Sequence, residues 1–246
     1  SVEVEVLARH GLPQALPGQF CALEIVRDGE PMKAAFSIVG ISKQGHWILG
    51  VKQARPGGVS EWIQKLDEAT SVSVAGPFGE FGVNDAARHH LLIAGGSGIT
   101  PVWAIAKALI QKGIHPVLIF GNDSPAEVMF GEDIRSAAEA GELKVIHVFD
   151  RQFEPAMNSE LHADSAVYIC GPQAMTQLIE GLLSHHPKHL VLKESYGKTL
   201  GQGKSSRLRW KPRWGKERVH PIGAGETLLK ASERAQLKWD QACGMG

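Results

Sequence analysis

A glycine-rich turn carries the clearest chemical signal in the sequence. Gly95, Gly96 and Gly98 follow a short apolar run, and Thr100 and Pro101 open a stretch with helical periodicity. Glycines let the backbone approach a pyrophosphate closely, and the N-terminus of the following helix attracts the negative charge. The turn therefore predicts a dinucleotide-binding site, although an ordinary strand-to-helix turn can have the same composition.

Other polar and special residues stand at the ends of later apolar runs. They are Asn122 with Asp123, then Cys170 with Gly171 and Pro172, and last Glu194 with Tyr196. In an open parallel sheet, ligands bind at the carboxyl ends of the strands. If the apolar runs are strands of one such sheet, these residues lie at the same edge as the glycine turn.

The elements that must position these residues fall into distinct zones. Residues 1–87 hold short apolar runs separated by glycine and proline, which predicts a small antiparallel β-barrel or sandwich. In residues 88–196 apolar runs alternate with helical stretches, which predicts a doubly wound parallel α/β sheet. Residues 197–206 are small and polar and are interpreted as a linker to a last segment, 207–246.

The expected elements follow these periodicities. In the first zone we expect strands at 1–6, 19–26, 35–40, 47–53 and 71–75, and a short helix after Gly58 that Ser60 caps. In the second zone we expect strands at 91–94, 116–120, 143–149, 166–170 and 190–193, and helices at 101–111, 126–140 and up to about 184. Gly113 and Gly141 stand where the first two of these helices would end.

Four motifs in order give a specific resemblance. Gly-Pro-Phe-Gly-Glu-Phe (76–81), the glycine turn (94–101), Phe-Gly-Asn (120–122) and Cys-Gly-Pro-Gln-Ala-Met (170–175) resemble the ferredoxin–NADP reductase family, over residues 1–196. The resemblance implies an FAD-binding barrel followed by an NAD(P)-binding domain. It also implies that Gly171, Pro172 and Met175 border the nicotinamide nucleotide.

The resemblance assigns the flavin to two stretches of the barrel. Phe36 would lie along the isoalloxazine and Ser37 would hydrogen-bond near its reactive nitrogen; plain core packing is the alternative for Phe36. The flavin pyrophosphate would be held by Gly57, Gly58, Val59 and Ser60. A simple turn and helix cap is the alternative for that stretch.

Ala34 is a departure from the family pattern. The family usually has arginine two residues before the aromatic residue, and Ala34 occupies that position here. Lys33 is adjacent, but neighbouring side chains on a strand point to opposite faces. The bidentate guanidinium contact to a phosphate is therefore missing, which leaves open a module that has lost its flavin.

The remaining site residues also follow from the resemblance. Cys170 would lie near the nicotinamide, with a buried small apolar residue as the equal alternative. Glu194 and Tyr196 match the acidic and aromatic residues beside the flavin, or are a solvated carboxylate and an anchoring ring. Asp123 would repel the extra phosphate of NADPH and accept from a ribose hydroxyl, which favours NADH unless Asp123 is only a turn residue.

The last segment resembles the beginning of a plant-type [2Fe–2S] ferredoxin domain. The residues that match are 225–231 and 243–246, with Cys243 as the first cluster ligand. Four ligands are needed, so no complete site is expected in this chain, and the truncation could belong to a fragment. A hairpin is expected over 207–219 and a helix over 226–236; a helical docking or dimerisation piece is the alternative.

Composition excludes several classes of protein. The formal net charge is zero over 246 residues, so nothing attracts the chain to nucleic acid or an anionic membrane. No apolar run is long enough to span a bilayer. Three distant cysteines give no disulfide framework, which favours a cytoplasmic protein. The histidine pairs at 89–90 and 185–186 have no zinc-like spacing and are interpreted as surface or strand-edge residues.

The resemblance implies an NAD(P)H-dependent flavin reductase. It would take hydride from NAD(P)H onto FAD and pass single electrons, through the [2Fe–2S] centre of the full-length protein, to an oxygenase or hydroxylase component. We expect a monomeric reductase component. The alternatives are an electron-transfer subunit that docks permanently on a dehydrogenase and a module without flavin.

Overall fold

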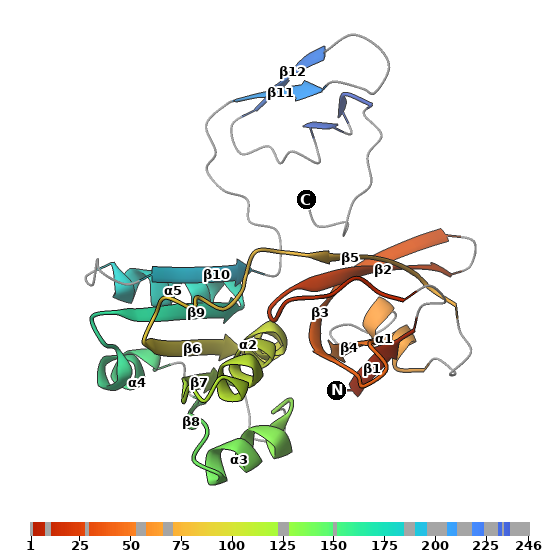
Figure 1. Cartoon of the computed structure of the whole chain (residues 1–246). Helices are drawn as coiled ribbons and strands as arrows, with labels where there is room; N and C mark the ends of the chain where they lie inside the picture. The colour runs from red at the N-terminus through yellow and green to blue at the C-terminus, as the bar shows by residue number, and fades with distance from the viewer. Residues whose placement is uncertain are drawn as a thin grey trace. The chain divides into compact units, whose positions relative to one another are not determined.

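A computed structural model of the chain describes residues 2–7, 11–27, 30–52, 58–65, 71–122, 128–149, 152–184, 190–195, 206–210, 218–223, 231–232 and 234–236. The structure divides into two units, residues 1–196 and 197–246. The first unit holds two five-stranded sheets, and the second holds a two-stranded sheet (Figure 1).

The first sheet is antiparallel, with the strand order β1-β4-β3-β2-β5. Its strands are β1 (Val2–Val6), β2 (Phe20–Arg27), β3 (Glu30–Ile41), β4 (Trp47–Val51) and β5 (Ser73–Phe78), and a short helix, α1 (Val59–Ile63), follows β4. Alternating apolar side chains of these strands, among them Leu23, Ile38 and Leu49, form one buried cluster. We call this part the barrel domain.

The second sheet is parallel, with the strand order β10-β9-β6-β7-β8. Its strands are β6 (His89–Gly95), β7 (Val117–Gly121), β8 (Lys144–Val148), β9 (Ser165–Gly171) and β10 (Leu190–Ser195). The central strands β6 and β9 are almost entirely buried, as expected for strands covered by helices on both faces. This is the doubly wound sheet that the sequence predicts.

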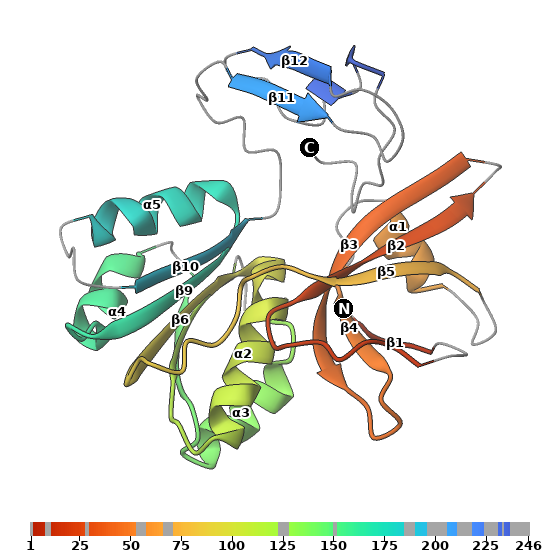
Figure 2. The ribbon, with the colours of Figure 1, turned by 45° about the horizontal axis from the view of Figure 1, so that its top comes forward.

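Helices cover both faces of the parallel sheet. The helices are α2 (Ile99–Gln111), α3 (Gly131–Glu139), α4 (Phe153–Glu160) and α5 (Gln173–Leu183), and one 3₁₀ turn, η1 (Gly96–Gly98), precedes α2. Figure 2 shows the sheet between α2 and α3 on one side and α4 and α5 on the other. Helix α2 also packs against β3 of the barrel domain, so it touches both sheets.

The second unit contains an antiparallel pair of strands, β11 (Ser206–Trp210) and β12 (Arg218–Ile222). The pair confirms the hairpin that the sequence predicts. The expected helix over 226–236 falls mostly outside the described residues.

Most of the expected elements are present, although β3 begins at Glu30, five residues before the expected start, and three further differences concern helices. Helix α3 begins at Gly131, five residues later than expected. Helix α4 was not expected. The third difference concerns Ser60: it lies inside α1, Gly58 is the N-cap, and no side chain caps this helix. Among the described residues no helix is long and apolar enough to cross a membrane.

Candidate functional site

The described residues of the predicted nucleotide motifs lie near the point where the strand order of the parallel sheet reverses. From β6 the chain proceeds outward to β7 and β8, and then returns to place β9 on the other side of β6. Such a switch point leaves a crevice beyond the carboxyl ends of the two central strands. Gly95 ends β6 and Gly171 ends β9, so both motifs lie at this switch point.

Close packing explains why the motifs contain glycine. A methyl group at Gly98 would lie 2.1 Å from the carbonyl oxygen of Cys170, and one at Gly95 would lie 2.4 Å from the sulfur of Met175. A methyl group at Gly171 would lie 2.5 Å from the methyl carbon of Met175. The turn after β6 and the turn after β9 are therefore held against each other without space for a Cβ.

Gly96 differs from its neighbours. Its φ is +52°, a backbone conformation that favours glycine, and a methyl group there would meet nothing within 4 Å. Gly95 and Gly98 are required by packing, whereas Gly96 is required by conformation and faces open space. A backbone exposed in this way at a helix start can approach a phosphate group.

A buried hydrogen bond joins the glycine turn to the barrel domain. The hydroxyl groups of Thr100 in α2 and Ser37 in β3 are 3.0 Å apart, and both side chains are buried. Thr100 Oγ1 also lies 3.0 Å from the carbonyl oxygen of Ser97. A hydroxyl has one proton, so when Thr100 donates to Ser97 it accepts from Ser37. The predicted nicotinamide motif and the predicted flavin motif are thus in direct contact.

Phe36 and Ala34 lie on the inner side of the barrel domain. Phe36 is 9% exposed and belongs to the apolar cluster, and Ala34 packs against it. This environment favours core packing for Phe36. Lys33 points the other way, because its ammonium group forms an ion pair with Glu24 at 2.7 Å on the neighbouring strand. The structure thus agrees with the expectation that Lys33 does not replace the missing arginine.

The stretch expected to hold the flavin pyrophosphate is described in part. Val59 is buried in the apolar cluster of the barrel domain. Gly58 has an extended conformation at the start of α1. Gly57 lies outside the described residues, as do Asp123, Tyr196 and Cys243, so their assignments stay predictions.

Asn122 follows β7 at the carboxyl edge. It is 8% exposed, its backbone N–H donates to the carbonyl of Val148, and its side-chain nitrogen Nδ2 is buried without a partner among the described residues. An unpaired buried amide costs free energy, and a nucleotide hydroxyl or phosphate would satisfy it. The side chain therefore fits a nucleotide at this edge.

Glu194 lies at the end of β10. Burial raises the pKa of its carboxyl group to about 7, and Oε2 has no partner among the described residues. It lines a cavity of about 320 Å³ with Glu80 and Phe81, residues that follow β5. A carboxyl group with this pKa can hold or release a proton near neutral pH. Sequence reasoning missed Glu80 and Phe81 as neighbours, although their motif was recognised.

Cys170 is fully buried in the core cluster between the parallel sheet and α2. Its side chain therefore has the surroundings of a small apolar residue. Its carbonyl oxygen, by contrast, meets the glycine turn at Gly98. Pro172 is the N-cap of α5 and lies against Gly95, and Pro101 is buried in the first turn of α2.

Comparison with known proteins gives the same assignment for this sheet. Residues 92–181 match the oxidoreductase NAD-binding domain. Phthalate dioxygenase reductase of Burkholderia cepacia is 28% identical over 174 residues, which are 64% of this chain and 51% of that protein. This chain therefore spans about half the length of that relative.

Two other relatives cover more of their own length. The putative toluene-4-sulfonate monooxygenase system reductase subunit TsaB2 of Comamonas testosteroni is 28% identical over 261 residues, or 100% of this chain and 81% of that protein. The electron transfer subunit of dihydroorotate dehydrogenase B (NAD(+)) of Listeria monocytogenes is 24% identical, covering 75% of this chain and 74% of that protein.

A solved structure of phthalate dioxygenase reductase, a modular protein for electron transfer from pyridine nucleotides to [2Fe–2S], has a similar fold. The TM-score is 0.68 at 24% identity, covering 99% of this chain and 78% of that one.

Proposed function

We propose that the chain is an NAD(P)H-dependent oxidoreductase of the ferredoxin–NADP reductase superfamily and that it moves hydride from NADH to FAD. The observation that carries this proposal is the buried contact between Thr100 and Ser37. It places the end of the glycine turn beside the barrel strand that resembles a flavin site. NADH and FAD would then meet where the glycine turn contacts β3 in the first unit.

The nucleotide would bind at the carboxyl edge of the parallel sheet. Support comes from the open backbone at Gly96 and the unpartnered Nδ2 of Asn122. The residues that would line it are Gly95, Gly96, Gly98, Thr100, Pro101, Asn122, Asp123, Cys170, Gly171, Pro172 and Met175. Helix α2 begins at this turn, so its amide groups favour a pyrophosphate there.

The flavin would lie against the barrel domain. Ser37 and Tyr196 would border the ring system, with Phe36 packed in the core next to Ser37, and Gly57 to Ser60 would border the pyrophosphate. When bound, the flavin supplies the conversion of a two-electron donor into a one-electron donor. When Thr100 donates to Ser37 instead of Ser97, Ser37 could donate its own proton to the ring. Glu194 would hold a proton on its carboxyl group. Cys170 would lie near the nicotinamide ring.

The identity of the flavin is directly testable. The stretch 57–60 resembles FAD-holding members of the family, so the chromophore extracted from purified protein should have the mass of FAD. The absence of an arginine at position 34 should make the complex weak enough that added FAD raises the occupancy. FMN, or no flavin even after reconstitution, would contradict the assignment.

The nucleotide preference should be for NADH. Asp123, which is expected at the carboxyl edge, would repel a 2′-phosphate, so kcat/KM should be higher with NADH than with NADPH, and Asp123→Arg should move the ratio toward NADPH. Asp164 precedes β9 at the opposite edge of the sheet, so Asp164→Arg is the matched control and should leave the ratio unchanged. A wild-type preference for NADPH would overturn this proposal.

The electron acceptor would be an oxygenase or hydroxylase component, reached through a [2Fe–2S] centre of a longer protein with Cys243 as one ligand. The similarity to the dihydroorotate dehydrogenase subunit supports a second candidate, a subunit that docks on a dehydrogenase. Size-exclusion chromatography with each class of partner separates them. A free reductase stays monomeric with the dehydrogenase, whereas a subunit co-elutes with it.

A further inference from the structure

The segment between the two sheets, residues 79–88, links β5 of the barrel domain to β6 of the parallel sheet. We call it the connecting segment. It passes beside Glu194, because a methyl group at Gly79 would lie 3.9 Å from Oε1 of that carboxyl group. Contacts hold it on both sides.

The barrel domain holds the beginning of the connecting segment. The side chain of Gln19 donates through Nε2 to the carbonyl oxygen of Gly79 at 3.1 Å. Gly18 has a φ of +94°, and a methyl group there would lie 2.0 Å from the carbonyl oxygen of Phe81. The backbone of the segment therefore lies directly against the loop before β2.

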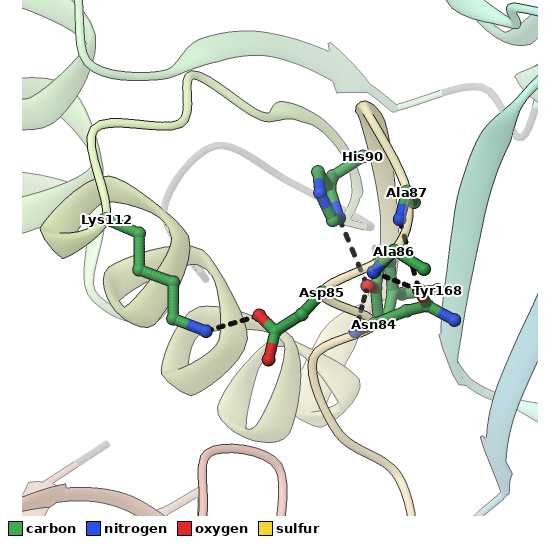
Figure 3. A network of polar contacts seen from close by, with 7 residues as sticks. All are labelled: Asn84, Asp85, Ala86, Ala87, His90, Lys112 and Tyr168. Atoms are coloured by element: carbon green, nitrogen blue, oxygen red, sulfur yellow. Dashed lines mark hydrogen bonds and ion pairs between the residues drawn. The ribbon is translucent and has the colours of Figure 1, made fainter.

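The parallel sheet holds the other end through Tyr168. The Tyr168 hydroxyl accepts a hydrogen bond from the backbone N–H of Asn84 at 2.9 Å, and it lies 3.1 Å from Nδ1 of His90 (Figure 3). The Tyr168 ring meets Phe81 edge-on, with centroids 6.2 Å apart. The side chain of Asn84 completes the turn by accepting from the N–H groups of Ala86 and Ala87.

Tyr168 links the connecting segment to the strand that ends at the candidate nucleotide site. It is fully buried in the middle of β9, and Cys170 stands two residues further along the same strand. One end of the connecting segment thus borders Glu194, and the other is fixed to the strand that carries the turn against Gly98. A shift of the segment would move the barrel domain relative to the carboxyl edge of the sheet.

We propose that Tyr168 is a positioning residue, which holds the connecting segment at Asn84 and Phe81 and so sets the distance between the flavin and the nicotinamide. The inference rests on the function proposed above. Hydride transfer is sensitive to such spacing, because a misplacement of about 1 Å can slow a reaction on the order of a hundredfold. Tyr168 touches neither cofactor in this arrangement and acts through the segment.

The test compares two variants in the full 246-residue chain. Tyr168→Phe removes the hydroxyl and keeps the ring. Ser165→Ala, at the other end of β9, removes a buried hydroxyl that accepts from the N–H of His162 at 3.0 Å. Tyr168→Phe removes the partner of both the Asn84 N–H and His90 Nδ1, whereas Ser165→Ala removes the partner of the His162 N–H, so both melting temperatures should fall and that of Tyr168→Phe should fall further. Only Tyr168→Phe affects the connecting segment.

Stopped-flow reduction of the flavin by NADH separates positioning from stability. We expect the limiting rate to fall about tenfold in Tyr168→Phe and to stay within about twofold of wild type in Ser165→Ala, with the Kd for NADH unchanged in both. Equal limiting rates in the two variants would overturn the proposal. If Tyr168→Phe does not fold, Phe81→Leu serves instead, and it should lower the rate in the same way.

A second readout does not need the cofactors. In the apoprotein, amide hydrogen exchange over residues 79–88 should be faster in Tyr168→Phe than in wild type and unchanged in Ser165→Ala. Unchanged exchange in Tyr168→Phe also overturns the proposal. If the wild-type protein binds no flavin, the function proposed above fails, while this exchange experiment still tests the hold on the connecting segment.

Discussion

Glu194 shows how a single carboxyl group is affected by its position at the end of an edge strand. Burial raises its pKa from 4.5 to about 7, so the folded protein retains a proton that the unfolded chain releases. The free energy of unfolding therefore falls as the pH rises from about 4.5 to about 7 and levels off above that. The same burial prepares the group to exchange a proton at neutral pH.

Replacing Glu194 by glutamine should remove this pH dependence. At pH 8 the Glu194→Gln apoprotein should be more stable than wild type by up to about 3 kcal/mol, because about 1.4 kcal/mol accompanies each unit of pKa shift. At pH 4 the two proteins should differ little. Urea unfolding at both pH values measures this.

The control for this experiment is Glu180→Gln. Glu180 is an exposed residue of α5 that pairs with Lys193, and an exposed ion pair contributes little. Its substitution should leave the slope of stability against pH unchanged. A wild-type protein whose stability does not fall between pH 4.5 and pH 7 would contradict the assigned burial of Glu194.

At this scale the sequence predicts residue types better than residue contacts. Ser37 and Thr100 were both expected in the site, but they are 63 positions apart, and no local pattern joins them. Tyr168 gave no signal, because an aromatic residue inside an apolar strand has the pattern of ordinary core. His90 was expected at the surface or at a strand edge, but it is 4% exposed near the start of β6, where its ring lies beside Tyr168. The wrong assignment of Ser60 as a cap has a local cause, since the glycine before Val59 begins the helix instead.

At the scale of elements, the turn between β6 and α2 is constrained by its neighbour across the switch point. Gly98 has φ −61°, which any residue adopts, so only space forbids a side chain there. Gly98→Ala would place a methyl group 2.1 Å from the Cys170 carbonyl oxygen. The turn after β9 would have to move, and the two motifs would separate.

We expect Gly98→Ala to lower the free energy of unfolding by about 1–3 kcal/mol, the usual cost of overpacking, and to weaken NADH binding at least tenfold. Gly181→Ala is the matched control. Gly181 lies in α5 with open space around it, so alanine there should stabilise the protein by about 0.5–1 kcal/mol. Equal Kd values for NADH in wild type and Gly98→Ala would show that this turn does not hold the nucleotide.

Two helices, α3 and α4, could not be predicted correctly from the periodicity of apolar residues. Helix α4 has only Phe153 and Met157 buried and contains Pro155 in its first turn, so its pattern is too short to stand out. Helix α3 starts late because Phe130 has a φ of 56°, which is a left-handed backbone conformation. Phenylalanine rarely adopts this conformation, so the sequence could not predict it. The strands were predicted well, because buried parallel strands are continuous apolar runs.

At the scale of the whole molecule, the order of the two sheets is what the sequence determines most directly. Short runs with glycine and proline give way to longer alternating elements, and the structure changes from an antiparallel to a parallel sheet between Phe78 and His89. The relation between the sheets could not be predicted. It depends on contacts such as those of Gly18 with Phe81 and of Gly50 with Thr100, whose partners are distant in the sequence.

The division of the chain leads to a prediction about its electron chemistry. The flavin and nicotinamide motifs both lie in residues 1–196, whereas Cys243 lies in the second unit. The proposed hydride transfer needs only these two motifs, so the 246-residue chain should reduce ferricyanide or a dye with NADH. One-electron delivery through a [2Fe–2S] centre needs four ligands. The chain has three cysteines in all, and Cys21 and Cys170 are buried in different cores.

The purified chain should therefore contain flavin but no stoichiometric iron or acid-labile sulfide, and it should not sustain turnover of an oxygenase partner. Colorimetric iron and sulfide assays beside a dye-reduction assay measure this. Cys243→Ser is the control, and it should leave dye reduction unchanged, because Cys243 lies outside both motifs of the proposed hydride transfer. Stoichiometric iron in the wild-type chain would refute the role given to Cys243. Full turnover with an oxygenase would show instead that electrons leave the flavin directly.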